Sequence, residues 1–290
     1  MSLSWPWHFT FVSPAEQQHC RELLDLRGYY AQLSVLVFLV AFRCYKSSFS
    51  RVEYANDSRQ AHISWWESAP FRGWSDTRAQ YVACLIWLSW LLGLCIWRSG
   101  EDYLHLTKAL GHVAISQLPF QVLMSPAWYI SASRPTSPSV VSILTAIPQS
   151  TLTCFHRLFG RVVLAPLLIM HATLYLSFFV QSPHPDFSSL LAKRIRELDV
   201  QWGLCGIVIM IFILLLARPL GSTGGLWAMK TASIHMRRQV FYIAHVLLIA
   251  AMCLAAYYHV AQAQTYVLQT LGAFALDTAC CWVFSRDKKH

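Results

Sequence analysis

Four histidines occupy matched positions on two strongly apolar stretches of the sequence. His156 and His171 lie 15 residues apart in "FHRLFGRVVLAPLLIMHATLYL", and His245 and His259 lie 14 residues apart in "QVFYIAHVLLIAAMCLAAYYH". Ionisable side chains are costly in a membrane-buried segment, so their presence there indicates a function. Since imidazole is a ligand for haem iron, these four rings are candidates for holding a metal or cofactor.

Helix geometry places the histidines in two layers. Fourteen positions at about 100° each return to within about 40° of the start, and they cover about 21 Å of helix axis. In a hydrocarbon core about 30 Å thick, each stretch then carries one histidine towards each side of the membrane. We expect the two stretches to run parallel, so that His156 faces His245 and His171 faces His259. Two such layers suit two haems that each have two histidine ligands and therefore pass electrons.

The 15-residue spacing between His156 and His171 needs a local irregularity. A fifteenth position overshoots by about 60° in a straight helix. Pro166 lies between them, and either a proline kink or a π-bulge would return His171 to the shared face. Histidines hydrogen-bonded inside a bundle are the simpler alternative, and the spacing is too wide for one tetrahedral zinc site. We interpret His112 and His235 as structural or loop residues.

The composition is that of an integral membrane protein. The chain has 290 residues, of which 56% are hydrophobic and 13% are charged, whereas an average soluble domain is about 25% charged. The net charge of +9 comes from basic residues beside apolar runs. This pattern indicates orientation in a membrane, with lipid as the partner, and argues against a nucleic-acid partner.

Seven segments are candidate membrane spans, which predicts an all-α, polytopic membrane helix bundle. The third is weakened by two prolines and two glutamines and could be a shorter or broken helix. The expected organisation is an extracellular segment 1–28, a transmembrane domain 29–284 and a cytoplasmic tail 285–290. The seven segments are Tyr29–Tyr45, Tyr81–Trp97, about Gly111–Ile130, about Phe155–Val180, Trp202–Ala217, Gln239–His259 and about Thr265–Phe284.

Basic residues predict the orientation. With seven spans, 16 of the 23 lysines and arginines fall on the side that carries the C-terminus. The C-terminus is therefore expected in the cytoplasm and the N-terminus outside, with the plasma membrane as the expected location. A glycosylation sequon at Asn56 lies in a loop that this orientation places inside; because a single sequon often arises by chance, the orientation follows the charges.

Several motifs resemble the transmembrane haem domain of the ferric reductase and NADPH oxidase superfamily, especially its fungal ferric reductase branch. "FHRLFGR" with a second histidine resembles the first ligand helix, and "RRQVFYIAHVLLIAAMCLAAYYH" resembles the second. "DYLHLTKALGHVAISQLPFQVLMS" and "FALDTACCWVFSR" resemble the flanking regions. The similarity covers about Asp102 to Asp277, and the paired histidines are its most specific part.

The resemblance implies an oxidoreductase component that moves electrons across a membrane. In this superfamily, electrons pass from cytosolic NADPH through FAD and two stacked b-type haems to an external acceptor such as a ferric chelate. By position, His156 with His245 would ligate the inner haem and His171 with His259 the outer one.

Four arginines accompany the inner layer. They would pair with the inner-haem propionates or with a docked reductase, and ordinary positive-inside anchoring explains them equally well. They are Arg157, Arg161, Arg237 and Arg238.

The sequence departs from the family in having no H-P-F-T-like flavin motif and no glycine-rich dinucleotide motif. We therefore expect no FAD or NADPH site in these residues and a separate flavin reductase as donor. One alternative is a truncated scaffold or interaction protein that binds no haem. Another is a transporter or channel with histidine proton relays, for which Asp277 is the only carboxylate well inside a predicted span.

Overall fold

The computed structural model describes residues 13–49, 65–71, 76–100, 102–125, 138–182, 185–217 and 234–286. The regular elements of these ranges are all helices, which confirms the all-α fold. In chain order they are α1 (Pro14–Phe49), η2 (Trp65–Glu67), α2 (Arg78–Ile96), α3 (Tyr103–Ser116), α4 (Leu118–Leu123), α5 (Val140–Thr145), α6 (Gln149–Phe159), η3 (Gly160–Leu164), α7 (Ala165–Gln181), α8 (Leu190–Arg194), α9 (Leu198–Ala217), α10 (Ile234–His259) and α11 (Ala261–Arg286).

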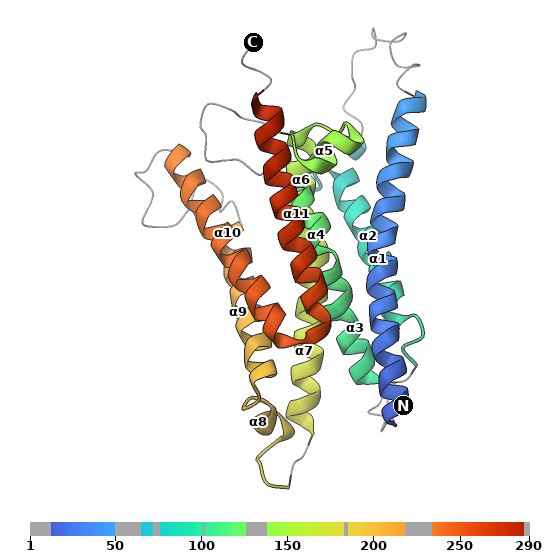
Figure 1. Cartoon of the computed structure of the whole chain (residues 1–290), viewed down its shortest axis with the longest axis vertical. Coiled ribbons are helices and arrows are strands. Elements are labelled where there is room, and N and C mark those ends of the chain that lie inside the picture. Colours follow the sequence, from blue (N-terminus) through green and yellow to red (C-terminus); the bar gives the residue numbers. More distant parts are fainter. Residues whose placement is uncertain are drawn as a thin grey trace.

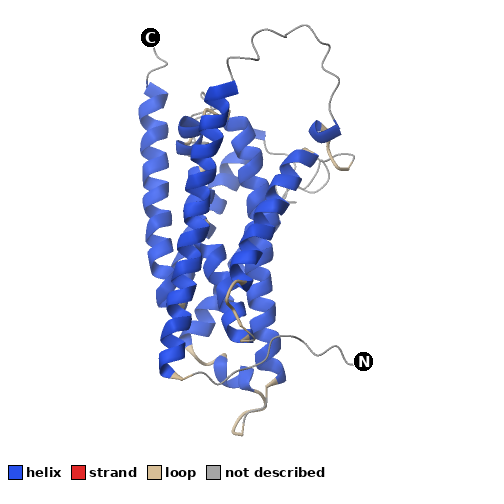
Figure 2. Ribbon diagram, turned by 90° about the vertical axis from the view of Figure 1, so that its right-hand side faces the viewer, coloured by secondary structure: helices blue, strands red, loops and turns tan. Residues whose placement is uncertain are grey.

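The long helices form one upright bundle, in which they run roughly parallel to one another (Figures 1 and 2). Six segments are long and apolar enough to cross a membrane: α1, α2, the continuous run α6–η3–α7, α9, α10 and α11. Each corresponds to a predicted span. The first helix, however, begins at Pro14 rather than at Tyr29, so it continues well into the segment predicted to precede the membrane.

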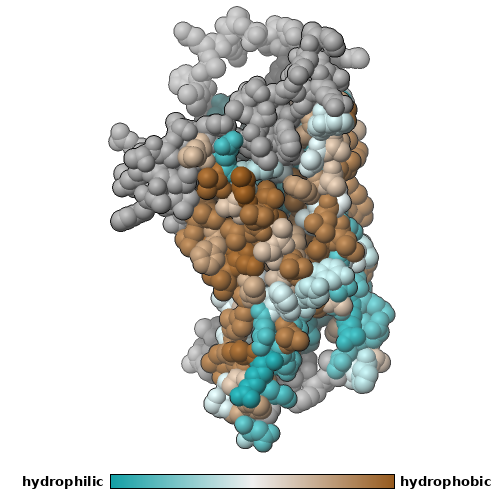
Figure 3. All heavy atoms as spheres, turned by 60° about the vertical axis from the view of Figure 1, so that its left-hand side comes forward, coloured by the Kyte–Doolittle hydropathy of each residue, from teal (hydrophilic) through white to brown (hydrophobic). Residues whose placement is uncertain are grey.

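The surface of the bundle is apolar because lipid is its expected solvent. In Figure 3 a broad belt of hydrophobic residues covers the visible face, and most of its polar residues gather below the belt. Large hydrophobic side chains are exposed on most of the long helices. They include Leu36, Val40, Ile86, Phe212, Leu247 and Leu268.

The third predicted span is a broken helix that lies inside the protein. It begins at Tyr103, earlier than the predicted Gly111, and Gln117 separates α3 from α4. Pro119 in the first turn of α4 has no N–H to donate, which favours a new helix start there. Nearly all of α3 is buried, because it packs against α1, α2, α7 and α11. A helix that faces protein can carry polar residues, and these weaken its apolar signal in the sequence.

The helices cross the bundle an odd number of times when α3 and α4 are counted as one crossing. Accordingly, α1 begins at the lower end and α11 ends at the upper end in Figure 1. Asp277 of α11 is fully buried, and its Oδ1 accepts a hydrogen bond from the N–H of Val140 at 2.8 Å. That contact ties α11 to the start of α5 and gives the carboxylate a structural role. Asn56 and the tail residues 287–290 lie outside the described residues.

A π turn interrupts the run that carries the first two histidines. Residues Gly160–Leu164 form η3, in which the N–H of Ala165 donates to the carbonyl of Gly160, five residues back. A π turn accommodates one residue more than an α-helical turn. The predicted irregularity between His156 and His171 is therefore present, and it lies just before Pro166 rather than at it.

Candidate functional site

The four histidines form two facing pairs, as their spacing predicts. The rings of His156 on α6 and His245 on α10 have centroids 6.4 Å apart and planes inclined by 81°. The rings of His171 on α7 and His259 at the end of α10 have centroids 6.3 Å apart and planes inclined by 67°. One pair lies above the other between α10 and the continuous run α6–η3–α7.

These separations fit one metal ion between the two rings of each pair. A metal–imidazole bond is about 2.0 Å long, and the ring centroid lies about 1.1 Å behind the bonding nitrogen. Two imidazoles that ligate one iron from opposite sides would therefore have centroids about 6.2 Å apart. Both pairs have this spacing, whereas imidazoles that hydrogen-bond to one another directly would lie closer together.

Three of the four rings are held by a main-chain carbonyl. Nδ1 of His156 lies 2.9 Å from the carbonyl oxygen of Gln121, and Nδ1 of His171 lies 2.7 Å from that of Thr107. Nδ1 of His259 lies 2.6 Å from the carbonyl oxygen of Asp199.

A carbonyl oxygen can only accept a hydrogen bond, so in each contact Nδ1 carries the hydrogen. The lone pair of the neutral ring is then on Nε2, where it can bind a metal. Such a contact also fixes the orientation of the ring.

His245 is positioned differently. Its ring stacks on that of Phe241 one turn earlier in α10, with centroids 5.5 Å apart and planes 18° apart. Its buried Nδ1 has no hydrogen-bond partner among the described residues. The orientation of this ring therefore depends on aromatic packing rather than on a carbonyl.

Two glycines give His171 and His259, the lower pair, room beside a neighbouring helix; His156 and His245 form the upper pair. A Cβ on Gly111 would lie 3.0 Å from Nδ1 of His171, and one on Gly203 would lie 2.7 Å from Cε1 of His259. Each glycine comes four residues after the residue whose carbonyl binds the same ring. The pattern of carbonyl at position i and glycine at i+4 thus occurs twice, as Thr107 with Gly111 and as Asp199 with Gly203.

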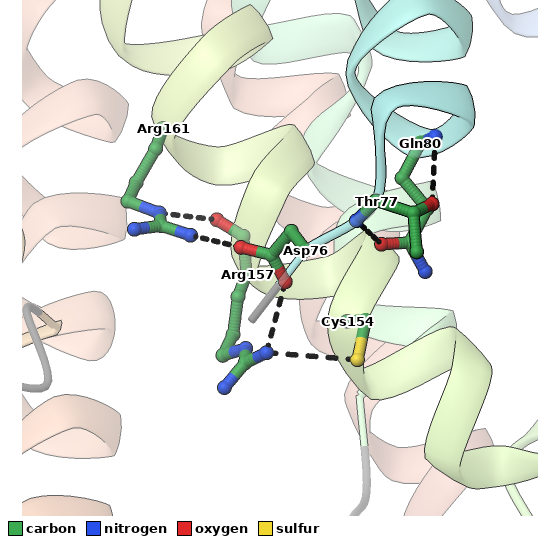
Figure 4. A network of polar contacts seen from close by, with 6 residues as sticks. All are labelled: Asp76, Thr77, Gln80, Cys154, Arg157 and Arg161. Atoms are coloured by element: carbon green, nitrogen blue, oxygen red, sulfur yellow. Dashed lines mark hydrogen bonds and ion pairs between the residues drawn. The ribbon is translucent and has the colours of Figure 1, made fainter. Parts of the chain in front are cut away.

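The predicted arginines beside His156 are paired with a carboxylate. Asp76, which precedes α2, accepts hydrogen bonds from Arg157 at 3.0 Å and from Arg161 at 2.9 Å (Figure 4). The Asp76 side chain is 5% exposed, and those of the arginines are about a third exposed. Asp76 was not predicted from the sequence as a partner of these arginines. The side chains of Arg237 and Arg238 on α10 lie outside the described residues.

At the other end of the bundle, Arg194 links residues of α7 and α9 that lie near the lower pair. Its guanidinium donates to the Tyr175 hydroxyl at 3.0 Å and to the Asp199 carboxylate at 3.1 Å, and it also pairs with Glu197. Burial alone would lower the pKa of Arg194, but the hydrogen bond with Tyr175 and the charges of Glu197 and Asp199 raise it. Arg194 therefore stays cationic.

The number of protein ligands separates this arrangement from a zinc site. The described part of the chain contains no group of three or more His, Cys, Asp or Glu side chains placed to hold one metal ion. A haem needs only two protein ligands for its iron, because the porphyrin supplies the other four. His112, which the sequence analysis set aside, contacts the Tyr266 hydroxyl at 3.2 Å and joins neither pair.

Comparison with known proteins places these residues in a family. Residues 110–256, just over half of the chain, match the family described as ferric reductase like transmembrane component. The chain belongs to this family. The matched region contains His156, His171 and His245, and it ends three residues before His259. Neither the curated proteins nor the solved structures compared with the chain include a match.

Membership of the ferric reductase-like family assigns the chain to transmembrane electron transfer in general, and members of this family typically bind haem. The residues present fit that cofactor, because each facing pair supplies two imidazoles at the separation that one iron between them would require. The apolar bundle around them suits a largely apolar macrocycle.

Proposed function

We propose that the chain is a di-haem electron conduit across a membrane, with His156 and His245 as axial ligands of one haem and His171 and His259 of the other. The observation that carries the proposal is the equal separation of the two ring pairs, 6.4 and 6.3 Å, one above the other on the same helices. When bound, each haem iron would supply a one-electron redox centre.

The residues of the chain have distinct roles in this proposal. The imidazoles would hold the irons, and the carbonyls of Gln121, Thr107 and Asp199 fix three ring orientations. If each pair held one haem iron between its two rings, no protein-free position would be left for substrate, and the chain would serve electron transfer rather than chemistry at the metal. In the three rings that donate from Nδ1 to a carbonyl, the lone pair of a neutral imidazole would lie on Nε2, so no proton would need to leave the ligating atom.

We propose that electrons enter on the side of His156 from a flavin reductase and leave on the side of His171 to an external acceptor such as a ferric chelate. The basic residues around His156 favour this direction, since such residues mark the cytoplasmic side. Arg157 and Arg161 would meet the inner-haem propionates or the donor, and Asp76 neutralises part of their charge. The plasma membrane remains the proposed location.

The test is the optical spectrum of the purified protein, reduced with dithionite, together with haem content per chain. About two low-spin b-type haems per chain are expected, and His245→Ala or His259→Ala should each remove about one. His112→Ala is the matched control, because this histidine lies outside both pairs, and it should keep both haems. A wild-type protein that stays colourless in a haem-replete host would refute the proposal and favour a scaffold without haem.

A further inference from the structure

The π turn between His156 and His171 determines whether both rings can face α10. In a regular helix a spacing of 15 residues would place His171 about 60° past the direction of His156, whereas a spacing of 14 would leave it about 40° short. The five residues of η3 absorb that extra residue. Since π geometry is rare and appears mostly at functional sites, something in the structure must stabilise it.

Two side chains donate to main-chain carbonyls just before the π turn. Nε2 of Gln121 donates to the carbonyl of His156 at 2.7 Å, and Nε of Arg161 donates to the carbonyl of Arg157 at 3.3 Å. Each is a second donor, because the N–H of Gly160 also reaches the carbonyls of His156 and Arg157; side chains that compete for carbonyls of the helix ladder favour a local irregularity. Gly160 admits Gln121 here, because a Cβ at this position would lie 3.2 Å from Nε2.

Asp76 holds the arginine that makes one of these contacts. Its carboxylate accepts from Arg161 at 2.9 Å and from Arg157 at 3.0 Å, and charge-assisted bonds of this kind are stronger than neutral ones (Figure 4). Asp76 is itself anchored, because the next residue, Thr77, caps α2 in a reciprocal pair with Gln80. The residue that precedes α2 therefore binds one arginine before Gly160, where the π turn begins, and one arginine after it.

We propose that Asp76 is a positioning residue that stabilises the π turn and thereby aligns His156 with His171. This inference rests on the proposed haem-ligand role of the two histidines. Without the Asp76 carboxylate, Arg161 loses its anchor and the turn can relax towards α geometry. Relaxation rotates α6 relative to α7, so the two histidines no longer share one face.

The test combines Asp76→Asn with a deletion of Val162. Asp76→Asn keeps the shape of the side chain but removes its charge, and it should lower the haem content from about two to about one per chain, because a misaligned histidine no longer holds its haem. Deleting Val162 shortens the spacing to 14 residues, so a plain α-helix then aligns the histidines. The deletion should therefore restore about two haems in the Asp76→Asn protein, and alone it should leave the content unchanged.

The rescue distinguishes alignment from a direct effect of charge on the haem, because deleting Val162 does not restore the carboxylate. Gln121→Met provides a second arm that leaves the charged cluster intact, and the same loss and rescue are expected. The inference is overturned if Asp76→Asn keeps both haems, or if the deletion fails to restore the lost one. A wild-type chain without haem would instead overturn the proposed function itself, so the two failures are distinguishable.

Discussion

Gly203 lies directly against the ring of His259, where a Cβ would come within 2.7 Å of Cε1 and 2.8 Å of Nδ1. Such an approach is closer than real Cβ atoms tolerate, so the second turn of α9 and the end of α10 can meet there only through glycine. The preceding turn of α9 supplies the carbonyl of Asp199 that holds His259. Gly111 stands in the same relation to His171.

We expect Gly203→Ala to displace His259 and weaken haem binding at the lower pair. The loss in haem affinity should be about 10- to 100-fold, as for other residues that support metal ligands. Gly111→Ala should act in the same direction through His171, and haem titration of the purified protein measures both effects.

The controls for these variants are Gly93→Ala and Gly272→Ala, which lie in spans and have open space where a Cβ would be added. They should bind haem as the wild type does. Equal losses in all four variants would show that any alanine in a span is harmful and would remove the special role of Gly203.

The ring planes predict the magnetic signature of the bound irons. Planes inclined by 81° and 67° are nearer to perpendicular than to parallel, an arrangement that brings two iron d orbitals close in energy. Electron paramagnetic resonance of the oxidised protein should therefore show strongly anisotropic low-spin signals at low field. A His259→Ala variant assigns the remaining signal to the upper pair, and ordinary rhombic signals would contradict the near-perpendicular rings.

Arg194→Ala should loosen the lower end of the bundle. It removes the contacts to Tyr175, Glu197 and Asp199, and each lost kcal/mol lowers the midpoint temperature of a chain of this size by about 2–4 °C. The signal of the lower haem should also change, because the carbonyl of Asp199 holds His259. Lys193→Ala makes the same charge change at an exposed neighbour, and equal effects of the two variants would refute the role of Arg194.

Arg27→Met should destabilise the fold without changing the haem content. The Arg27 side chain is fully buried, donates to the carbonyl of Trp97 at 3.1 Å and contacts Nε2 of His105 at 2.8 Å. Leaving these groups unpaired inside the bundle should cost about 1–2 kcal/mol. Thermal unfolding in detergent measures the loss, with the exposed Arg21→Met as control, and a haem content that falls in parallel would contradict a purely structural role.

Much of the architecture could be predicted from the sequence because lipid constrains helices that face it. Spans such as α2, α9 and α10 face outwards along most of their length, so their apolar runs give their positions directly. The third span was predicted to begin eight residues too late, at Gly111 rather than at Tyr103. It is enclosed by other helices, and a helix without lipid contact need not be apolar.

The candidate site was predictable in part for a similar reason. Helical periodicity is local, so the spacing of four histidines on two helices predicts two layers and also predicts the irregularity between His156 and His171. Neither Asp76 nor Gln121 could be predicted to support that irregularity, because both are distant from it in sequence. Gly111 and Gly203 are recognisable in the sequence as small residues in or near predicted spans. The sequence does not show which histidine ring packs against each of them.

The sequence by itself therefore determined that the protein is a membrane helix bundle with four histidines in two layers, since burial in lipid and helix periodicity act on neighbouring residues. Only the tertiary structure decided which carbonyls orient three of the rings and which glycines leave space beside them. It also decided which carboxylate binds the arginines at the π turn. These contacts join residues from different helices, and their geometry depends on how the helices pack rather than on any local pattern.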